Sequence, residues 1–366
     1  MLDSAMLAGA IAGKKSLDTG VGSSVAITEA NTAAANFFAG NSDGFPATLT
    51  ANFSVSGSTL TGVGSAVASV PTNFMKIVGI PIMTFSVHSG SSSNTQPYVN
   101  VYLLIDISAS MLLPSTDAGI AQMRAGQGCA LACHDRTDGK DSYGWSLKNG
   151  VQLRYQVVNQ GVDNLLTYLN NDATLKAHVK VGLWSFDHAL SQMSQVTSNY
   201  STVKDNFPTP SLASNDVAAA TPFDSLIDNF VGIVGKGGDG SSSGSPKKMV
   251  IIATDGVNDP TREWISNTSI RPQVKVFSTG FCKTFETNNV IVAIINTPYL
   301  PMTWDWGYNA TLGQPGSLGG ATRVDDIPIA LKACAGNYFT VAADVASIQS
   351  SFTKLFTMTS AIRLTK

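Results

Sequence analysis

From residue 100 onward, strand-like and helix-like segments alternate along the chain, and this alternation limits the possible folds. Apolar runs of strand length occupy 100–108, 179–187, 247–256, 288–299 and, more briefly, 337–342. Segments typical of helices occupy 151–172, 222–235, 327–335 and 344–358. Such alternation is typical of a parallel sheet with helices on both faces. We therefore predict an α/β, doubly wound, mostly parallel sheet for residues 99–366.

The first 98 residues follow a different pattern. Residues 1–40 are rich in small residues and predict a helix that is interrupted near Gly20 and Gly22. Alternating patterns then predict strands at 47–57 and 80–90, with a short helix between them that begins near Pro71. We expect residues 1–98 to form a smaller α+β domain, a helix plus a small antiparallel sheet. The polar segment "SGSSSNTQP" (89–97) has the composition of a linker or surface loop.

Charge and hydropathy exclude two classes of protein. Charged residues make up only 13% of the chain and the net charge is -2, so no basic surface is available to hold nucleic-acid phosphates. The apolar stretch near the start, "AMLAGAIAG", is far shorter than the roughly 20 residues that cross a bilayer. We expect a soluble chain that does not bind nucleic acid.

Oxygen-bearing side chains follow two of the predicted strands. Asp106, Ser108 and Ser110 end the first strand in "LLIDISAS", and Asp255 ends another in "IIATDG". Ligands of open parallel sheets bind beyond the carboxyl ends of the strands, where such side chains converge. Carboxylates and hydroxyls suit a hard cation such as Mg²⁺, although the same residues could simply cap the next helix or turn. The matching pair of strand ends favours a metal site.

Residues 99–358 resemble a von Willebrand factor A domain. The D-x-S-x-S motif of that family's metal-ion-dependent adhesion site matches Asp106, Ser108 and Ser110, and its aspartate matches Asp255. The family's threonine falls best on Thr221, just before a predicted helix. The resemblance implies a divalent cation, most simply Mg²⁺ with Mn²⁺ or Ca²⁺ as alternatives, that accepts a carboxylate from a partner.

Nearly the whole chain also resembles the TadG-like proteins of bacterial tight-adherence (Flp) pilus systems. The matching segments are "LDSAMLAGA", "SVPTNFMKIVGI", "CALACH", "TPYLPM", "LKACAGNYFTVA" and "IQSSFTKLF". The resemblance implies a pilin-like N-terminal module and a surface location. Such proteins normally begin with a transmembrane helix that this sequence lacks, so we expect a processed or shortened form, attached to a membrane only through that missing segment.

Four cysteines fall into two pairs. Cys129 and Cys133 lie in an insertion at 112–145, and we expect a local disulfide there; a zinc site with His134 is the alternative, but a fourth ligand is lacking. Cys282 and Cys334 are expected to form a second disulfide that closes a loop of about 50 residues. Paired cysteines fit an oxidising, extracytoplasmic compartment.

Catalytic patterns are weak by comparison. His88, His134, His178 and His188 lie in dissimilar contexts, and no nucleophile elbow accompanies them, so we expect no enzyme. A metal-dependent hydrolase would need a general base beside the ion, and neither strand end offers a Glu or His. Trp304, Trp306 and Tyr308 form an aromatic cluster that either packs on the sheet edge or recognises a polymer or sugar.

The two resemblances imply two possible functions. The first is a minor pilin or tip adhesin of a tight-adherence pilus, with metal-dependent binding to pilus subunits or to a surface or host protein or glycan. The second is a pilus assembly or anchoring factor whose metal only braces the loops. Chelator-sensitive adhesion would distinguish the first from the second.

Overall fold

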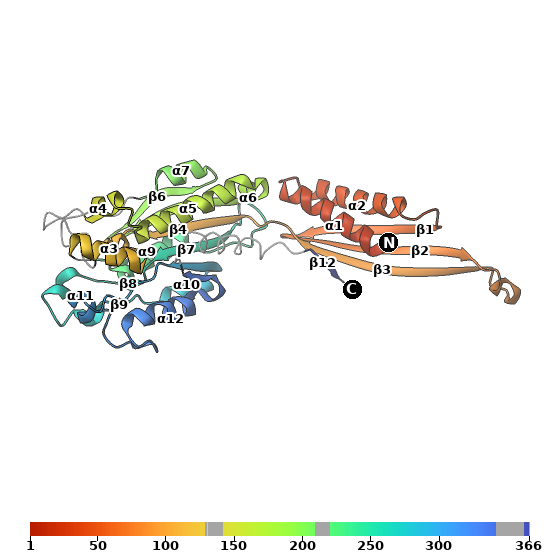
Figure 1. The fold of residues 1–366 in the computed structure, drawn as a ribbon. Coiled ribbons are helices and arrows are strands. Elements are labelled where there is room, and N and C mark those ends of the chain that lie inside the picture. The colour runs from red at the N-terminus through yellow and green to blue at the C-terminus, as the bar shows by residue number, and fades with distance from the viewer. Residues whose placement is uncertain (129, 131–141, 209–219, 342–361, 366) are drawn as a thin grey trace.

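The computed structural model describes residues 1–128, 130, 142–208, 220–341 and 362–365, and most of its strands belong to two separate sheets (Figure 1). One is an antiparallel sheet of four strands, and the other is a mostly parallel sheet of six strands. A short two-stranded ribbon accompanies the larger sheet. The four-stranded sheet has one hydrophobic core, and the six-stranded sheet has a core on each face.

Two helices, α1 (Leu2–Asp18) and α2 (Ser23–Gly40), pack closely against each other on the first sheet. A side chain at Gly9 would place its Cβ only 2.7 Å from the carbonyl oxygen of Ala30, so the contact requires a residue without a Cβ. The predicted interruption is confirmed, because Gly20 lies between the helices with a φ of +83°. The small-residue pattern of the sequence is thus the contact surface of a helix pair.

The first sheet has the strand order β1-β2-β3-β12 and is antiparallel throughout. Its strands are β1 (Ala47–Ser56), β2 (Thr59–Pro71), β3 (Ile82–Asn94) and β12 (Ile362–Thr365). The strands predicted at 47–57 and 80–90 are confirmed, whereas β2 was not predicted. The expected short helix is a single 3₁₀ turn, η1 (Met75–Val78).

The predicted linker at 89–97 is wrong over its first six residues. Residues 89–94 continue β3, where they pair with β2. Ser91 and Ser93 are fully buried, because β3 contacts α1 and only small side chains fit under the helix. The connection between the two sheets is therefore short, and the carboxylate of Asp18 accepts a hydrogen bond of 2.7 Å from the backbone N–H of Gln96 within it.

The second sheet has the strand order β11-β10-β7-β4-β5-β6. Its strands are β4 (Val99–Asp106), β5 (Val179–Phe186), β6 (Leu190–Thr197), β7 (Lys247–Thr254), β10 (Val290–Asn296) and β11 (Phe339–Val341). Five of them are parallel, and β6 runs antiparallel to β5 at the edge. The predicted α/β architecture is confirmed, although the edge strand β6 was not predicted.

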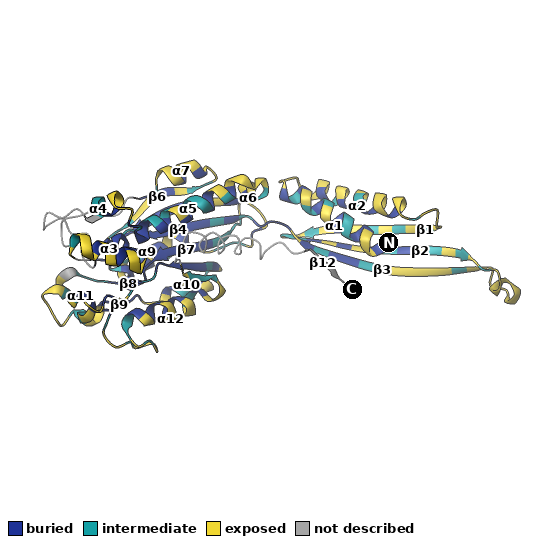
Figure 2. Cartoon of the chain, viewed as in Figure 1, coloured by how far each residue is buried: buried dark blue, intermediate teal, exposed yellow. Residues whose placement is uncertain are grey.

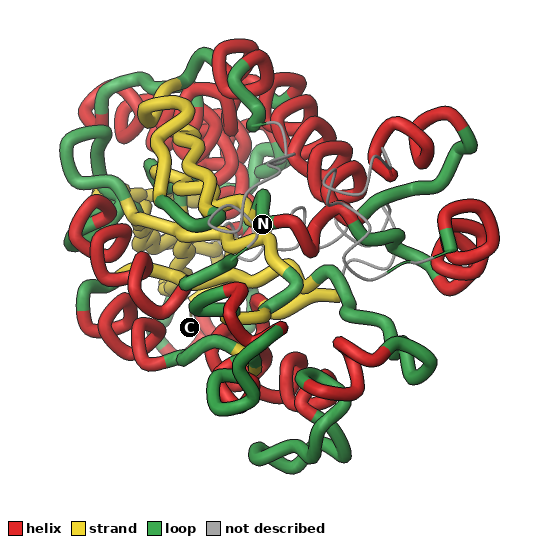
Figure 3. Tube along the Cα trace, turned by 90° about the vertical axis from the view of Figure 1, so that its left-hand side faces the viewer, coloured by secondary structure: helices red, strands yellow, loops and turns green. Residues whose placement is uncertain are grey.

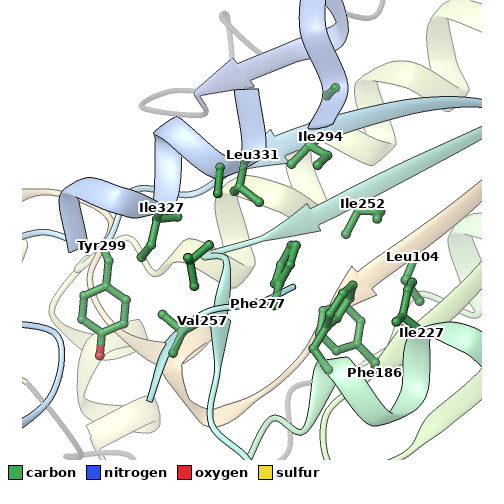
Figure 4. Packing of buried hydrophobic residues seen from close by; sticks show 14 of the residues in the cluster. Leu104, Phe186, Ile227, Ile252, Val257, Phe277, Ile294, Tyr299, Ile327 and Leu331 are labelled. Carbon is green, nitrogen blue, oxygen red and sulfur yellow. The ribbon is translucent and has the colours of Figure 1, made fainter. Parts of the chain in front are cut away.

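Helices cover both faces of this sheet. Successive residues of β4 alternate between two cores: Leu103 packs with α5 (Arg154–Asn171), and Leu104 packs with α9 (Phe223–Val234), α10 (Gly280–Thr287) and α12 (Arg323–Ala335). Figure 4 shows part of the second core, in which Ile227 lies near Leu104 and Phe186. Figure 2 shows the central strands buried and the outer helix surfaces exposed. Burial on both faces explains why these strands have continuous apolar sequences.

The remaining described elements surround the sheet. They are α3 (Asp117–Gln127), α4 (Ser142–Lys148), α6 (Ala173–His178), α7 (Tyr200–Asp205), α11 (Trp306–Ala310), β8 (Val257–Asn258), β9 (Lys275–Val276), η2 (Ala109–Leu112), η3 (Arg262–Ile265), η4 (Arg271–Gln273) and η5 (Gly336–Tyr338). The helix predicted at 344–358 lies outside the described residues.

The chain returns to the first sheet near its end. The sequence prediction assigned residues 99–366 to the second domain, but β12 pairs antiparallel with β3, with Arg363 opposite Ser92. The pairing satisfies backbone groups on the otherwise open edge of β3. The six-stranded unit is therefore joined to the first sheet at both of its ends.

Candidate metal-binding site

The carboxyl ends of β4 and β7 bring two aspartates to one edge of the sheet. The strands are adjacent and parallel, with Ile105 opposite Ala253, so Asp106 and Asp255 follow at neighbouring positions. Both aspartates are completely buried, although buried carboxylates are rare without a charged partner. Figure 3 looks onto this end of the molecule, where loops and helices surround the strand ends.

Hydrogen bonds hold the carboxylate of Asp106 in place. Its Oδ1 accepts from the backbone N–H of Ser108 at 2.9 Å, and its Oδ2 accepts from the hydroxyl of Thr254 at 2.7 Å. The hydroxyl oxygens of Ser108 and Ser110 lie 3.1 Å apart on the turn that follows. Three of the predicted residues therefore lie together, and Thr254, which the sequence analysis did not select, positions one of them. Its only sequence signal was its place beside Asp255 in "TDG".

Asp255 pairs with a buried arginine that the sequence analysis missed. Its Oδ1 accepts from the backbone N–H of Val257 at 3.1 Å, and its Oδ2 lies 3.2 Å from Nη1 of Arg154. The side chain of Arg154 has no exposed surface, and its guanidinium lies over the ring of Tyr299, 4.3 Å from the ring centroid. The signal in the sequence was a charged residue at the start of an otherwise apolar helix face, in "QLRYQVV".

A further residue supports the loop after β7 from the adjacent strand. The amide of Asn296, at the end of β10, donates to the carbonyl oxygens of Thr254 and Asp255, each at 3.3 Å. It is almost completely buried. These hydrogen bonds fix the backbone of the loop that carries Asp255.

Thr221 lies in the same group of loops. Its backbone pairs with that of Asp259, with N–H to oxygen distances of 2.7 Å and 3.0 Å, which ties the start of α9 to the chain just beyond Asp255. Thr221 is buried, but within the described chain no hydrogen bond joins its hydroxyl to the other four predicted residues. Its place beside the site is clear from the backbone, and its role as a ligand stays a prediction.

The electrostatics of the site favour an added positive charge. Burial, and after it the nearby carboxylate of Asp255, raise the pKa of Asp106 from its ordinary value to about 7, against the opposing effect of hydrogen bonds from Ser108 and Thr254. Arg154 contacts Asp255 but, among the described residues, has no hydrogen bond to Asp106. The uncompensated charge therefore lies on Asp106, where a proton or a cation can neutralise it.

The donor set fits a hard divalent cation. Carboxylate and hydroxyl oxygens are the ligands that Mg²⁺ takes in proteins, usually with one or two carboxylates and several waters. In the described part of the chain there is no cluster of three or more His, Cys, Asp or Glu side chains. The zinc alternative at Cys129, Cys133 and His134, and the predicted Cys129–Cys133 disulfide, lie outside the described residues.

The second predicted disulfide is confirmed. Cys282 of α10 and Cys334 of α12 are bonded, with a sequence separation of 52 residues and a Cα–Cα distance of 5.6 Å. The bond joins two helices that cover the same face of the sheet. It therefore stabilises the scaffold that carries the site rather than the site itself.

The predicted aromatic cluster divides into two parts. Tyr308 is buried in the core, whereas Trp304 and Trp306 are 38% and 59% exposed. The guanidinium of Arg124 lies 4.1 Å from the centroid of the Trp304 ring, and Trp264 lies 6.0 Å from Trp306. Packing accounts for the tyrosine, and the two tryptophans remain on the surface.

Within the described residues, no helix is long and apolar enough to cross a membrane. A scan against protein-family models finds no match, and a search of curated protein sequences finds none either.

Solved structures that align with this chain include a conserved hypothetical protein, a domain of a pilus tip protein and a pilus adhesin. BatB from Bacteroides thetaiotaomicron is 14% identical, with 70% of this chain and 98% of that chain aligned and a TM-score of 0.38. The vWF domain of the type V pili tip protein Mfa5 from Porphyromonas gingivalis is 12% identical, with 72% and 95% aligned and a TM-score of 0.38. The pilus adhesin SpaC from Lactobacillus rhamnosus GG is 12% identical, with 85% and 34% aligned and a TM-score of 0.41. These values are too low to assign a function to this chain.

Proposed function

We propose that this protein is a metal-dependent binding protein of the bacterial cell surface, with a von Willebrand factor A domain built on the second sheet. Its site consists of Asp106, Ser108, Ser110, Thr221 and Asp255, and it holds a divalent cation, Mg²⁺ before Mn²⁺ or Ca²⁺. The observation that carries the proposal is the pair of buried aspartates at adjacent strand ends, beside two serine hydroxyls.

The residues of the chain have separate tasks in this proposal. Thr254 and the backbone of Ser108 orient Asp106, so its carboxylate needs little rearrangement to bind. Ser110 is the least buried of the five, which places the open side of the site at the D-x-S-x-S turn. The bound cation supplies an electrophilic position that accepts a carboxylate oxygen of the partner.

The position of the site suits the display of a binding surface. β4 begins directly after the short connection from β3, and in Figure 1 it runs away from the first sheet. Its carboxyl end, and with it Asp106, therefore lies at the end of the molecule remote from α1 and α2. A partner can reach that end while the first sheet and its helices serve for attachment.

The same proposal gives the protein the role of a TadG-like minor pilin or tip adhesin in a tight-adherence pilus. Its partners would be pilus subunits, or a surface or host protein or glycan, in an extracytoplasmic setting. The disulfide between Cys282 and Cys334 supports that setting, because structural disulfides persist in oxidising compartments.

One observation favours the second function, a pilus assembly or anchoring factor whose metal only braces loops. Asp106, Ser108 and Asp255 are completely buried, so a cation among them would be shielded from a partner. In that case the ion would join the loops after β4 and β7, and adhesion would not depend on it.

A metal titration tests the site. In calorimetry with Mg²⁺ and Mn²⁺, we expect saturable binding by the wild type and a loss of about tenfold or more in affinity for Asp106→Asn. Asp205→Asn is the matched control, since Asp205 is an exposed carboxylate at the end of α7. Equal affinities for Asp106→Asn and the wild type would contradict the proposed site.

An adhesion assay separates the two functions. Bacteria that carry the wild-type protein should lose adhesion in EDTA and regain it with Mg²⁺, and cells with Asp106→Asn should adhere poorly while still making fibres. An assembly factor gives the opposite result: EDTA leaves adhesion intact, and fibres fail to form when the protein is deleted.

A further inference from the structure

We propose that Arg154 is a built-in counter-cation of this site, which competes with the divalent ion for Asp255 and so weakens ion binding. The inference rests on the proposed metal site and concerns its regulation. It predicts that the guanidinium leaves Asp255 when the ion binds.

The first step is the position of the guanidinium. Nη1 of Arg154 donates both to the carbonyl oxygen of Ser110 and to Oδ2 of Asp255, each at 3.2 Å. It thereby joins the D-x-S-x-S turn after β4 to the loop after β7. These are the two loops that the proposed ion would join, and the guanidinium and the ion share one acceptor, the carboxylate of Asp255.

The second step is that Arg154 is held there against the dipole of its own helix. It is the first residue of α5, where the helix dipole disfavours a positive charge. Its backbone N–H donates to the carbonyl oxygen of Leu113 at 3.0 Å, and Pro114 and Leu153 form an isolated bridge, so the helix start is fixed beside the turn. The pairing with Asp255 outweighs the dipole because no solvent reaches the side chain.

The third step is that the guanidinium is only partly satisfied. Nε and Nη2 are buried and have no hydrogen-bond partner among the described residues. These two nitrogens form one side of the fork through which arginine commonly binds a carboxylate in a bidentate manner. Asp255 instead meets a single nitrogen at 3.2 Å, longer than the usual 2.7–2.9 Å of a charge-assisted bond. The single contact is weaker than the bidentate pair that arginine frequently forms, and a weaker pair is easier for another cation to replace.

The fourth step is the balance of charge. When both aspartates are ionised, Asp106 and Asp255 carry two negative charges and Arg154 carries one positive charge. A divalent ion then adds two positive charges, which leaves an excess positive charge in a buried place for as long as the guanidinium stays. Repulsion in that low-dielectric surrounding is strong. The carbonyl oxygen of Ser110 and the neutral ring of Tyr299 remain as partners of the guanidinium and can hold it away from Asp255.

Two substitutions test the charge of Arg154 directly. Arg154→Met keeps a long side chain against Tyr299 and removes the charge, whereas Arg154→Lys keeps the charge. In calorimetry with Mn²⁺, we expect Arg154→Met to bind about tenfold more tightly than the wild type, which corresponds to about 1.4 kcal/mol. Arg154→Lys keeps the positive charge that repels the ion and should stay within about threefold of the wild type. Circular dichroism and thermal melting check that both variants fold.

The outcomes distinguish this inference from the proposed function. If Asp106→Asn abolishes Mn²⁺ binding but Arg154→Met does not strengthen it, the counter-cation inference is wrong and the metal site stands. If neither the wild type nor Arg154→Met binds Mn²⁺, both the proposed metal site and the counter-cation inference are wrong. If only Arg154→Met binds, and Asp106→Asn in that background abolishes the binding, the inference is supported in its strongest form.

A measurement on the wild type covers the case in which Arg154→Met does not fold. In protein labelled with ¹⁵N-arginine, the Nε–H signal of Arg154 is identified by its absence from Arg154→Lys. We expect this signal to shift in a saturable manner during a Mg²⁺ titration, as the guanidinium leaves Asp255. An unchanged signal at an Mg²⁺ concentration that saturates the site would overturn the inference.

Discussion

Asp106 should make the metal-free protein less stable as the pH rises. Its pKa is raised from the ordinary 3.8 to about 7 in the folded chain, chiefly by burial and then by the carboxylate of Asp255. Between these two values the folded state holds a proton that the unfolded state has already released. The stability due to that proton is complete below pH 4 and is lost as the pH rises through about 7.

The size of the effect follows from linkage. Each pKa unit corresponds to about 1.4 kcal/mol, and about two units separate pH 5 from the folded pKa, so the loss between pH 5 and pH 8 is about 2.5 kcal/mol. Asp106 is completely buried, so solvent screening does not reduce this figure substantially. Burial also raises the pKa of Asp224, which contributes in the same direction. A comparison with Asp106→Asn is therefore needed to isolate the effect.

The assay is urea unfolding in EDTA at several pH values between 5 and 8, followed by near-ultraviolet circular dichroism. The free energy of unfolding of the wild type should fall relative to that of Asp106→Asn as the pH rises, because the amide cannot titrate. Saturating Mg²⁺ at pH 8 should restore much of the difference. Parallel pH profiles for the wild type and Asp106→Asn in EDTA would refute the reasoning about the buried charge.

Two further predictions concern the scaffold. Replacing Cys282 and Cys334 together by Ser should lower the free energy of unfolding by about 4 kcal/mol, the loop-entropy value for a separation of 52 residues, which chemical denaturation would measure. Gly9→Val should destabilise the α1–α2 pair by roughly 3 kcal/mol because a Cβ there meets Ala30, whereas Gly40→Ala, in open space, should change little; thermal melting compares them.

Local patterns were sufficient for the elements that are buried on both faces. The apolar runs that became β4 and β7 are typical of the middle of a parallel sheet, and adjacency of these strands brings Asp106 and Asp255 together. The bonded pair Cys282 and Cys334 was also predictable, since the chain contains few cysteines.

Strands without a continuous apolar run were missed. β2 and β6 consist largely of small and polar residues, and they are strands because a partner strand satisfies their backbone groups. Ser91 and Ser93 have the composition of a linker, yet α1 covers them. The composition of a segment indicates how well that segment is solvated on its own. It does not indicate which other segment will cover it in the folded protein.

The same distinction between sequence and tertiary structure applies to the residues of the proposed metal site. The sequence alone determined the positions of Asp106, Ser108, Ser110 and Asp255, because a parallel sheet brings its strand ends to one edge whatever the loops contain. Only the tertiary structure decided that Thr254 would donate to Asp106 and that Arg154, 101 residues before Asp255, would become its partner. The periodicity of a sequence reflects contacts between residues a few positions apart. The pairing of buried charges depends instead on which side chains the folded core removes from water.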